Sequence, residues 1–205
     1  IDFDICFLND IAVANSSLLG EYTQVDPRVR TFLIAIKKWA KDRQINAAKD
    51  GYISSYAWVN MAIFYLQFIG MVPSLQCPML MKDLDIVIDS ESYWNSINSL
   101  DTAYMKWKLV RNVWTAPAAY MDTPISLLVY GFFEFYSGQF PSGLFAVSMK
   151  EGKIVVPKLA SNKISAFLSI EDPFETYGSH SPHDLGTPAD ENGSKKITEY
   201  IEQSK

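Results

Sequence analysis

The stretch Asp26–Tyr56, DPRVRTFLIAIKKWAKDRQINAAKDGYISSY, predicts two helices joined by a short loop. Asp26 can accept backbone N–H bonds at a helix N-cap, and Pro27 occupies the first helical position, where a missing N–H group costs nothing. The apolar residues that then recur at helical spacing are Val29, Phe32, Leu33, Ile36 and Ala40. We therefore expect one face of the first helix to be buried.

Two lysines of this stretch stand off the apolar stripe. Lys37 and Lys41 are four residues apart, so their ammonium groups leave the helix on one side about one turn apart. After a loop that contains Gly51, Ser54–Tyr56 begins the next helix with hydroxyl groups and backbone amides. Two such lysines, a helix N-terminus and an aromatic ring are what a nucleoside triphosphate needs. On spacing alone, the alternative is a solvated basic face beside an ordinary serine cap.

The composition is that of a folded chain. Of 205 residues, 48% are hydrophobic and 14% aromatic, enough for a core in one large or two small domains. The net charge of -5 gives no general attraction to nucleic acid, so a phosphate or RNA site must be a local cluster. Cys6 and Cys77 lie in apolar surroundings without metal-ligand spacing, and we interpret them as reduced core residues of an intracellular protein. The longest apolar run, residues 57–72, is short for a membrane span and predicts a buried helix, so we expect no membrane association.

Residues 1–9 alternate apolar and acidic side chains with the period of a β-strand. Burying a carboxylate such as Asp4 on a strand whose other side chains enter a hydrophobic core costs free energy, unless a partner or a metal compensates its charge. One strand cannot satisfy its own backbone groups, so its partner strands must come from elsewhere. A helix is expected from Asp10, and its buried side would comprise Ile11, Ala14, Leu18, Leu19 and Tyr22.

The rest of the chain predicts further helices and a few short strands, which makes the fold class α+β and mostly helical. Gly138 and Pro141 are expected to end the last long helix. The expected segments are helices over residues 54–67, 101–115 and 124–136, a β-hairpin over 144–156, a short strand over 167–170 and a short amphipathic segment over 195–202.

Several of these segments together resemble one family, the terminal uridylyltransferases and cytoplasmic-type poly(A) polymerases among the DNA polymerase β-like nucleotidyltransferases. The series covers residues 1 to about 186, so the resemblance does not depend on one short motif. The matching segments are Asp4-Ile5 with Phe7 and Asn9, Asn15-Ser16 with Leu18-Leu19, Asp26-Pro27-Arg28, Lys37 with Trp39-Ala40-Lys41, Gly51 with Ser54-Ser55-Tyr56, the helix from Leu127-Leu128 to Phe135-Tyr136, Ile170-Glu171-Asp172-Pro173-Phe174-Glu175, and His183-Asp184-Leu185-Gly186.

The resemblance implies that the chain is divided into three parts. Residues 1–20 would be the C-terminal end of the nucleotidyltransferase catalytic domain, residues 21–190 the central helical, PAP-associated nucleotide-recognition domain with its small hairpin, and residues 191–205 a polar C-terminal tail or helix. In the family, a glycine-serine motif and two metal-binding aspartates precede the strand that carries the third aspartate, and this chain starts on that strand. We therefore expect a fragment that is inactive alone, unless the upstream half is supplied as a second polypeptide.

The resemblance also implies the roles of individual residues. In this family three carboxylates hold two Mg2+ (or Mn2+) ions, which activate the 3′-hydroxyl of RNA and stabilise the departing pyrophosphate. Asp4 matches the third carboxylate and would be both catalytic and a metal ligand. The implied nucleotide-binding residues are Asn9, Asn15 and Ser16 near the ribose, Lys37, Lys41, Ser54 and Ser55 at the triphosphate, Tyr56 under the base, and Asp172, Glu175 and His183 at the base edge.

His183 bears on the choice of nucleotide. In the family a histidine in this loop is associated with preference for uracil, because it fills space that a purine would need, so we expect addition of UMP from UTP to RNA 3′ ends without a template. The segment Thr176–Pro182 is longer than the family's usual spacing, which makes His180 a rival and a merely solvated histidine a further alternative.

Two other functions stay open at this stage. The near alternative is a poly(A) polymerase that uses ATP, and the distant one is a non-catalytic RNA-processing scaffold that retains the nucleotide-binding domain. The expected partners are UTP or ATP, an RNA 3′ end and proteins of an RNA-processing complex. We expect an intracellular protein, in the cytoplasm in preference to the nucleus or the mitochondrion.

Overall fold

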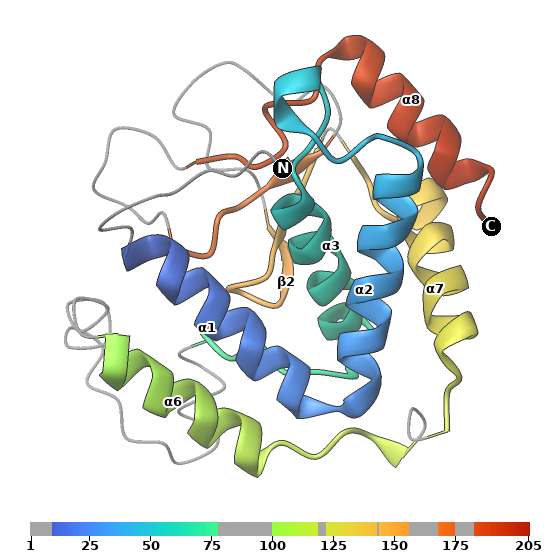
Figure 1. Ribbon diagram of the computed structural model, residues 1–205. Helices are drawn as coiled ribbons and strands as arrows, with labels where there is room; N and C mark the ends of the chain where they lie inside the picture. Colours follow the sequence, from blue (N-terminus) through green and yellow to red (C-terminus); the bar gives the residue numbers. More distant parts are fainter. Residues whose placement is uncertain (1–9, 78–99, 119–121, 143, 156–167, 175–182) are drawn as a thin grey trace.

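The computed structural model describes residues 10–77, 100–118, 122–142, 144–155, 168–174 and 183–205, which form a mostly helical α+β fold (Figure 1). The expected fold class is therefore confirmed, and the strand expected over residues 1–9 lies outside the described residues. In chain order the elements are α1 (Asp10–Val25), α2 (Pro27–Asp42), the 3-10 turn η1 (Ala48–Asp50), α3 (Ser55–Phe68), α6 (Leu100–Val113), α7 (Ile125–Glu134), the π-helical turn η4 (Phe135–Gln139), β1 (Ala146–Ser148), β2 (Lys153–Val155), β3 (Ser169–Ile170) and α8 (Glu191–Glu202).

Helix α2 begins where the sequence predicts. The Asp26 carboxylate accepts a hydrogen bond from the Arg28 backbone N–H at 2.8 Å and forms an ion pair with the Arg28 guanidinium at 2.7 Å. The same guanidinium donates to the Thr123 carbonyl at 2.9 Å, which ties the start of α2 to the segment before α7. The expected buried stripe is confirmed in full and consists of Val29, Phe32, Leu33, Ile36 and Ala40.

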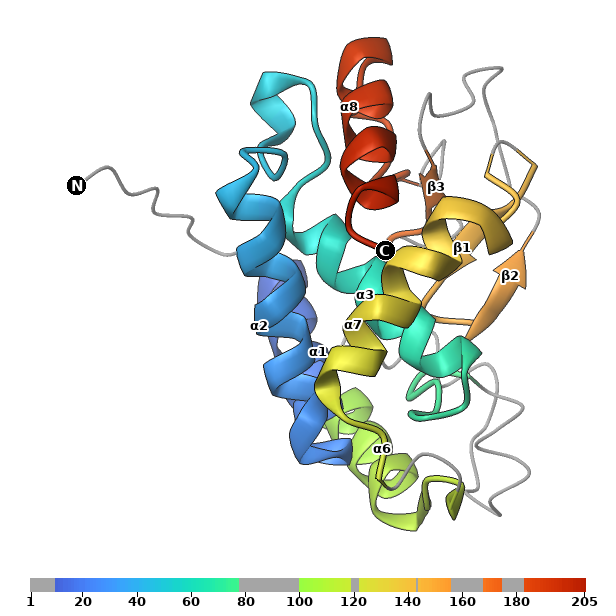
Figure 2. The same cartoon turned by 90° about the vertical axis from the view of Figure 1, so that its right-hand side faces the viewer.

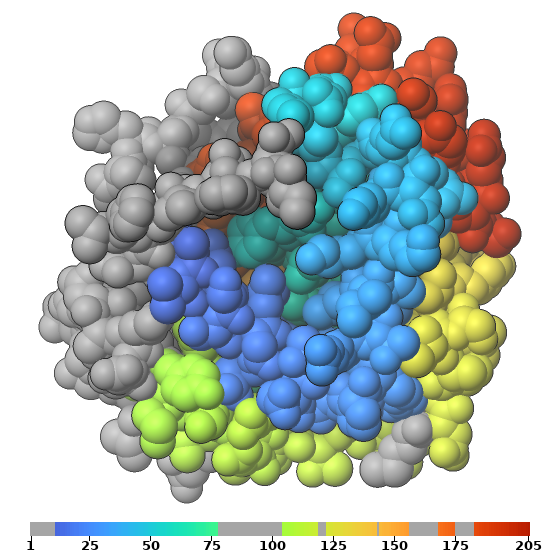
Figure 3. Space-filling view, in the orientation of Figure 1, coloured from blue at the N-terminus to red at the C-terminus, as the bar shows by residue number. Residues whose placement is uncertain are grey.

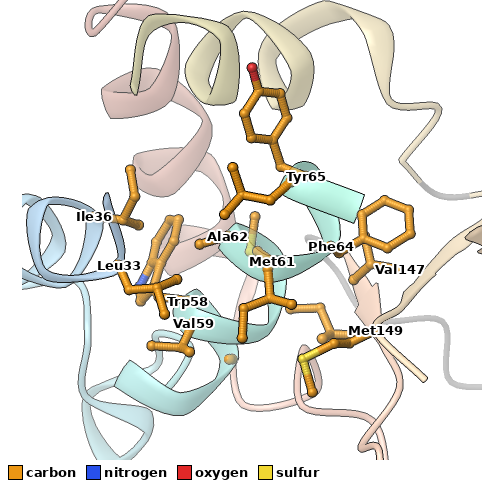
Figure 4. Packing of buried hydrophobic residues seen from close by; sticks show 14 of the residues in the cluster. Leu33, Ile36, Trp58, Val59, Met61, Ala62, Phe64, Tyr65, Val147 and Met149 are labelled. Atoms are coloured by element: carbon orange, nitrogen blue, oxygen red, sulfur yellow. The ribbon is translucent and has the colours of Figure 1, made fainter. Parts of the chain in front are cut away.

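Helix α3 is the centre of the fold. Its N-cap is Ser54, whose Oγ accepts a hydrogen bond from the Ala57 N–H at 3.1 Å, and all residues from Ala57 to Gln67 are buried. Figures 1 and 2 show α3 between α2 and the three strands. Trp58 lies against the α2 side of the core, and Phe64 lies on the side of the sheet (Figure 4). The buried helix expected from the sequence is thus confirmed, and no described helix is long and apolar enough to cross a bilayer.

The small sheet has the strand order β2-β1-β3. Strand β1 pairs with β2 in the antiparallel sense, with Ala146 opposite Val155, and with β3 in the parallel sense, with Ala146 opposite Ser169. The hairpin and the short strand expected from the sequence are both present. Because Asp172 is only two residues beyond the end of β3, the sheet fixes the position of this acidic residue.

The buried side of α1 differs from the expectation at Ile11 and at Glu21. Ile11 is 50% exposed, because no described element covers this face of the first turn of α1. The charged residue Glu21 is also on the buried side, which was not expected. Arg111 of α6 compensates its carboxylate through an ion pair at 2.6 Å. The positions that follow the expectation are Ala14, Leu18 and Tyr22, which are buried, and Leu19, which is half-buried.

Three smaller expectations are also corrected. Helix α8 starts four residues before the expected segment, because Asp190 caps it by accepting a hydrogen bond from the Gly193 N–H at 2.7 Å. The helix after Pro124 is α-helical only as far as Glu134 and then widens into η4. Cys77 is a free thiol as expected, but it is half-buried and not part of the core.

Replacing Asp26 by Asn tests the ion pair at the start of α2, because asparagine keeps a cap acceptor and removes the charge. Hydrogen bonds from the Arg28 side chain are the main reason that the pKa of Asp26 lies below its usual range. The carboxylate therefore stabilises the fold above its unfolded pKa of about 4, and this contribution is lost as the pH falls through the folded pKa. In urea denaturation, we expect Asp26→Asn to lower the free energy of unfolding by about 1–2 kcal/mol at pH 7, and progressively less in more acidic solution.

Asp42→Asn is the matched control. Asp42 also pairs with a cation, Lys38, at 2.6 Å, but the two side chains are 54% and 71% exposed. We expect this variant to cost less than about 0.5 kcal/mol. Equal losses in the two variants would contradict the role given to the Asp26 ion pair.

Candidate nucleotide site

Helices α1 and α3 meet at Asn15 and Tyr56. The Tyr56 hydroxyl donates a hydrogen bond to Oδ1 of Asn15 at 2.6 Å, and the Asn60 side-chain amide donates to the Tyr56 carbonyl at 2.9 Å. Burial raises the pKa of the Tyr56 phenol well above its usual value, and the negative charge of Asp172 raises it further. The Tyr56 phenol therefore stays protonated, and the residue is held at its hydroxyl by Asn15 and at its carbonyl by Asn60. Because Asn15 uses its oxygen as an acceptor, its amide nitrogen is the group that it can offer to a ligand.

Asp172 and His183 lie next to each other beyond the end of β3. Asp172 is 8% exposed, and its Oδ1 accepts a hydrogen bond from the Phe174 backbone N–H at 2.9 Å. Its Oδ2 lies 3.5 Å from Nδ1 of His183, whose side chain is 50% exposed. Strand β3 contacts α3, and the charge of Asp172, which follows this strand, acts on the Tyr56 phenol.

Asp184 fixes the segment that carries His183, a role that the sequence analysis missed. Hydrogen bonds to the Asp184 carboxylate attach the chain after residue 182 to β3, and they place His183 beside the Asp172 loop. His180 and Glu175 lie outside the described residues. The donors to the Asp184 carboxylate are the backbone N–H groups of Ile170 and Gly186, both at 2.8 Å, and the Ser169 hydroxyl at 2.7 Å.

The lysines of α2 differ in their partners. Lys38 pairs with Asp42 at 2.6 Å on the outer side of the helix. Within the described part of the chain, no carboxylate lies within ion-pair distance of Lys37 or Lys41, and both side chains are exposed. These two ammonium groups are therefore accessible to an anion from solution.

Two serines stand at the N-terminus of α3. The Oγ of Ser54 accepts a hydrogen bond from the helix backbone, and the Oγ of Ser55 accepts one from the Asn46 side-chain amide at 3.0 Å. Because each oxygen is used as an acceptor, each hydroxyl hydrogen can be donated to an anion. The backbone N–H groups and the dipole of α3 add positive potential at the same end. The N-terminus of α3 can thus contribute to binding of a phosphate group.

The three helices of the site border one depression of the surface. In the space-filling view the molecule is hollowed between α1 and α2, and α3 forms the floor (Figure 3). Asn15 belongs to the first of these helices, Lys37 and Lys41 to the second, and Tyr56 to the third.

The described residues do not form the metal site that the resemblance implies. Among them, no three His, Cys, Asp or Glu side chains are placed to hold an ion. Asp4, the expected ligand, and Asn9 lie outside the described residues. Ser16 is described, but it is exposed and its hydroxyl donates at 2.9 Å to a carbonyl of its own helix. The described part therefore offers contacts for a nucleotide and not for its metal ions.

A glycine links the lysines of α2 to the serines of α3. Gly51 has a φ of 80°, in the left-handed region that other residues rarely adopt. A Cβ atom at this position would lie 2.5 Å from Oδ2 of Asp190, and the Gly51 carbonyl accepts a hydrogen bond from the Asp190 N–H at 3.1 Å. The backbone conformation therefore favours glycine here, and a side chain would have to displace the Asp190 carboxylate that caps α8.

Residues 124–177 match the family model described as Cid1 family poly A polymerase. The solved structure of Cid1 in complex with the UTP analog UMPNPP superimposes with a TM-score of 0.69 at 25% identity, over 96% of this chain and 58% of that one. The fold is thus that of a Cid1-type nucleotidyltransferase.

Two curated relatives differ in the nucleotide that their names indicate. Terminal uridylyltransferase cid1 of Schizosaccharomyces pombe is 25% identical in an alignment of 209 positions that covers 95% of this chain and 47% of the relative. Poly(A) RNA polymerase GLD2 of Rattus norvegicus is 28% identical in an alignment of 178 positions that covers 85% of this chain and 34% of the relative. The chain is similar to both kinds of enzyme in the Cid1 group, and it spans about a third to a half of the length of these relatives.

Substitution of Gly51 by alanine tests whether the loop before α3 depends on glycine. We expect Gly51→Ala to lower the free energy of unfolding by about 2–3 kcal/mol, because it adds a collision with Asp190 to the cost of the left-handed backbone. Gly70→Ala is the control, since its φ is 77° but a Cβ there would meet no atom within 4 Å. It should cost about 1 kcal/mol in the same denaturation measurement. Equal losses would show that the Asp190 contact is unimportant.

Proposed function

We propose that the protein containing this chain is a template-independent RNA 3′-terminal nucleotidyltransferase that adds UMP from UTP. The observation that supports uridylyl transfer is the distance of 3.5 Å between Nδ1 of His183 and Oδ2 of Asp172, the carboxylate whose charge acts on Tyr56. A histidine at this edge would occupy space that a purine base needs, and the Asp172 carboxylate can accept a hydrogen bond from a nucleobase N–H directly or through water. We place the protein inside the cell, in the cytoplasm.

The described residues would bind and orient the nucleotide. Tyr56 offers a ring face to the base, and Asn15 offers an amide donor beside it. Lys37 and Lys41 neutralise the charge of the triphosphate, whose phosphates also receive hydrogen bonds at the N-terminus of α3. The 3′-hydroxyl of the RNA then attacks the α-phosphorus in line, a new phosphodiester bond forms, and pyrophosphate leaves.

Two Mg2+ or Mn2+ ions would supply the remaining chemistry, activation of the 3′-hydroxyl and stabilisation of charge on pyrophosphate. Asp4 would be one of the residues that hold them. The residues of α2 and α3 act on the nucleotide itself, so nucleotide binding and transfer can be measured separately.

Poly(A) synthesis from ATP is the second candidate, because the relatives include the poly(A) polymerase GLD2. Incorporation of each of the four nucleoside triphosphates on a short RNA primer by the full-length protein separates the two. We expect UTP to be preferred, and we expect His183→Ala to shift the ratio of kcat/KM for UTP over ATP by about tenfold or more toward ATP, since a steric block worth about 1.4 kcal/mol is removed.

His180→Ala is the control for His183→Ala and should leave this ratio unchanged. Preference of the unaltered protein for ATP would contradict the uridylyl assignment, and a shift caused by His180→Ala alone would contradict the placement of His183. If the full-length protein incorporates no nucleotide, the non-catalytic scaffold is the better account.

Asp4→Ala in the full-length protein tests the assignment of the third metal-binding carboxylate. We expect the rate of nucleotide transfer to fall by at least about a hundredfold, because the metal ions that activate the 3′-hydroxyl lose a ligand. The thermal unfolding midpoint should stay the same. Asp2→Ala, on the same expected strand, is the matched control and should retain activity. Substantial transfer by Asp4→Ala would show that the catalytic carboxylate is another residue.

A further inference from the structure

Helix α8 touches the loop between α2 and α3 most closely at Gly51, and the Lys196 ammonium group also donates to the Tyr52 hydroxyl at 3.4 Å. The Asp190 N–H donates to the Gly51 carbonyl at 3.1 Å, and the Asp190 carboxylate holds the Gly193 N–H at 2.7 Å. A Cβ atom built on Gly193 would overlap the Gly51 carbonyl oxygen. The first turn of α8 and the loop at Gly51 are therefore in contact with no space for a side chain.

The same helix also lies against the C-terminal end of α2. The Trp39 indole N–H donates to the Ser204 hydroxyl at 3.0 Å. The Arg43 guanidinium lies 4.8 Å from the centre of the Trp39 ring and 5.7 Å from that of Tyr200. Figures 1 and 2 show α8 beside this end of α2. Helix α8 thus contacts both α2 and the loop that leads to α3.

We propose that α8 positions the triphosphate-binding groups, through the contact between Gly193 and Gly51. This inference rests on the proposed nucleotide-binding function. Gly51 is three residues from Ser54, so a displacement of its carbonyl is transmitted to the N-terminus of α3, while the turn of α2 that carries the lysines is bordered by Trp39 and Arg43, which contact Ser204 and Tyr200. Groups that bind the triphosphate must be held in fixed positions, because a shift of about 1 Å can lower affinity or rate by a large factor. Gly193 and Gly51 are positioning residues that need not touch the nucleotide.

The substitution Gly193→Ala in the full-length protein is the direct test. Alanine is ordinarily better than glycine within a helix, but here its methyl group must displace the Gly51 carbonyl. We expect the dissociation constant for UTP with Mg2+ to rise roughly tenfold, and that for UMP to change by less than about twofold, because UMP lacks the two phosphates that the lysines and serines would bind. Gly20→Ala in α1 is the matched control, since its Cβ would meet no atom within 4 Å, and it should change neither constant.

Two results of this comparison would overturn the inference. One is an unchanged affinity of Gly193→Ala for UTP. The other is a loss of affinity by the same factor for UTP and UMP, which would mark a general loss of folded protein. If the unaltered protein binds no UTP, the proposed nucleotide site itself is wrong, and the inference falls with it.

Hydrogen exchange in the unaltered protein provides a test that does not depend on folding of a variant. Coupling between two sites is reciprocal, so UTP binding should slow exchange of the Asp190 amide, which is bonded to the Gly51 carbonyl. UMP should not slow it. The Gln203 amide at the far end of α8 donates to the Glu199 carbonyl at 3.0 Å and serves as the internal reference. Exchange at Asp190 that is equal with UTP and with UMP would contradict the role of α8.

Discussion

Burial of α3 from Ala57 to Gln67 is the constraint on which the rest of the structure depends. A helix that is apolar on all sides must be covered on all sides, and here α2 lies on one side and the three strands on the other. Its polar end is then the only part that can serve a ligand. Because the body of the helix is immobilised by packing, Ser54, Ser55 and Tyr56 at its first turn are held in place.

A buried polar network fixes α1 relative to α3. The Gln67 amide donates to the Tyr22 hydroxyl and to the Met149 carbonyl, both at 2.8 Å, and the Leu75 N–H also donates to Tyr22 at 3.1 Å. Burial raises the pKa of the Tyr22 phenol far above its usual value, so the network stays neutral. The bond between Asn15 and Tyr56 joins the same two helices at their other ends. Two polar contacts, far apart on one helix pair, thus determine where Asn15 stands at the nucleotide site.

The features that the sequence predicts well are those with local causes. The N-cap at Asp26, the stripe on α2 and the start of α3 at Ser54 all follow from neighbours within one or two turns, and all are present. Exposure of Ile11 was not predictable, because it depends on which elements cover α1. The early start of α8 had a local signal in Asp190, but glycine at 193 argues against a helix unless its contact with Gly51 is known.

The placement of the candidate site was predictable only in part. The spacing along α2 indicates that Lys37 and Lys41 share one side of the helix. Lys38 differs from them because its ammonium group is paired with Asp42. The position of His183 depends on the hydrogen bonds of Asp184 to β3, fourteen and fifteen residues away, which no local pattern reveals. The charge of Asp172 acts on Tyr56 for the same reason, because the sheet and α3 meet only in the folded chain.

The central claim is that α1, α2, α3 and the segment after β3 form one nucleotide site. A crystal structure of the full-length protein with a non-hydrolysable UTP analogue and Mg2+ tests it most directly. We predict the uracil ring stacked on Tyr56 with its edge at Asp172 and His183, and the triphosphate at Lys37, Lys41 and the N-terminus of α3. A nucleotide bound elsewhere, with both lysines facing only solvent, would contradict this account.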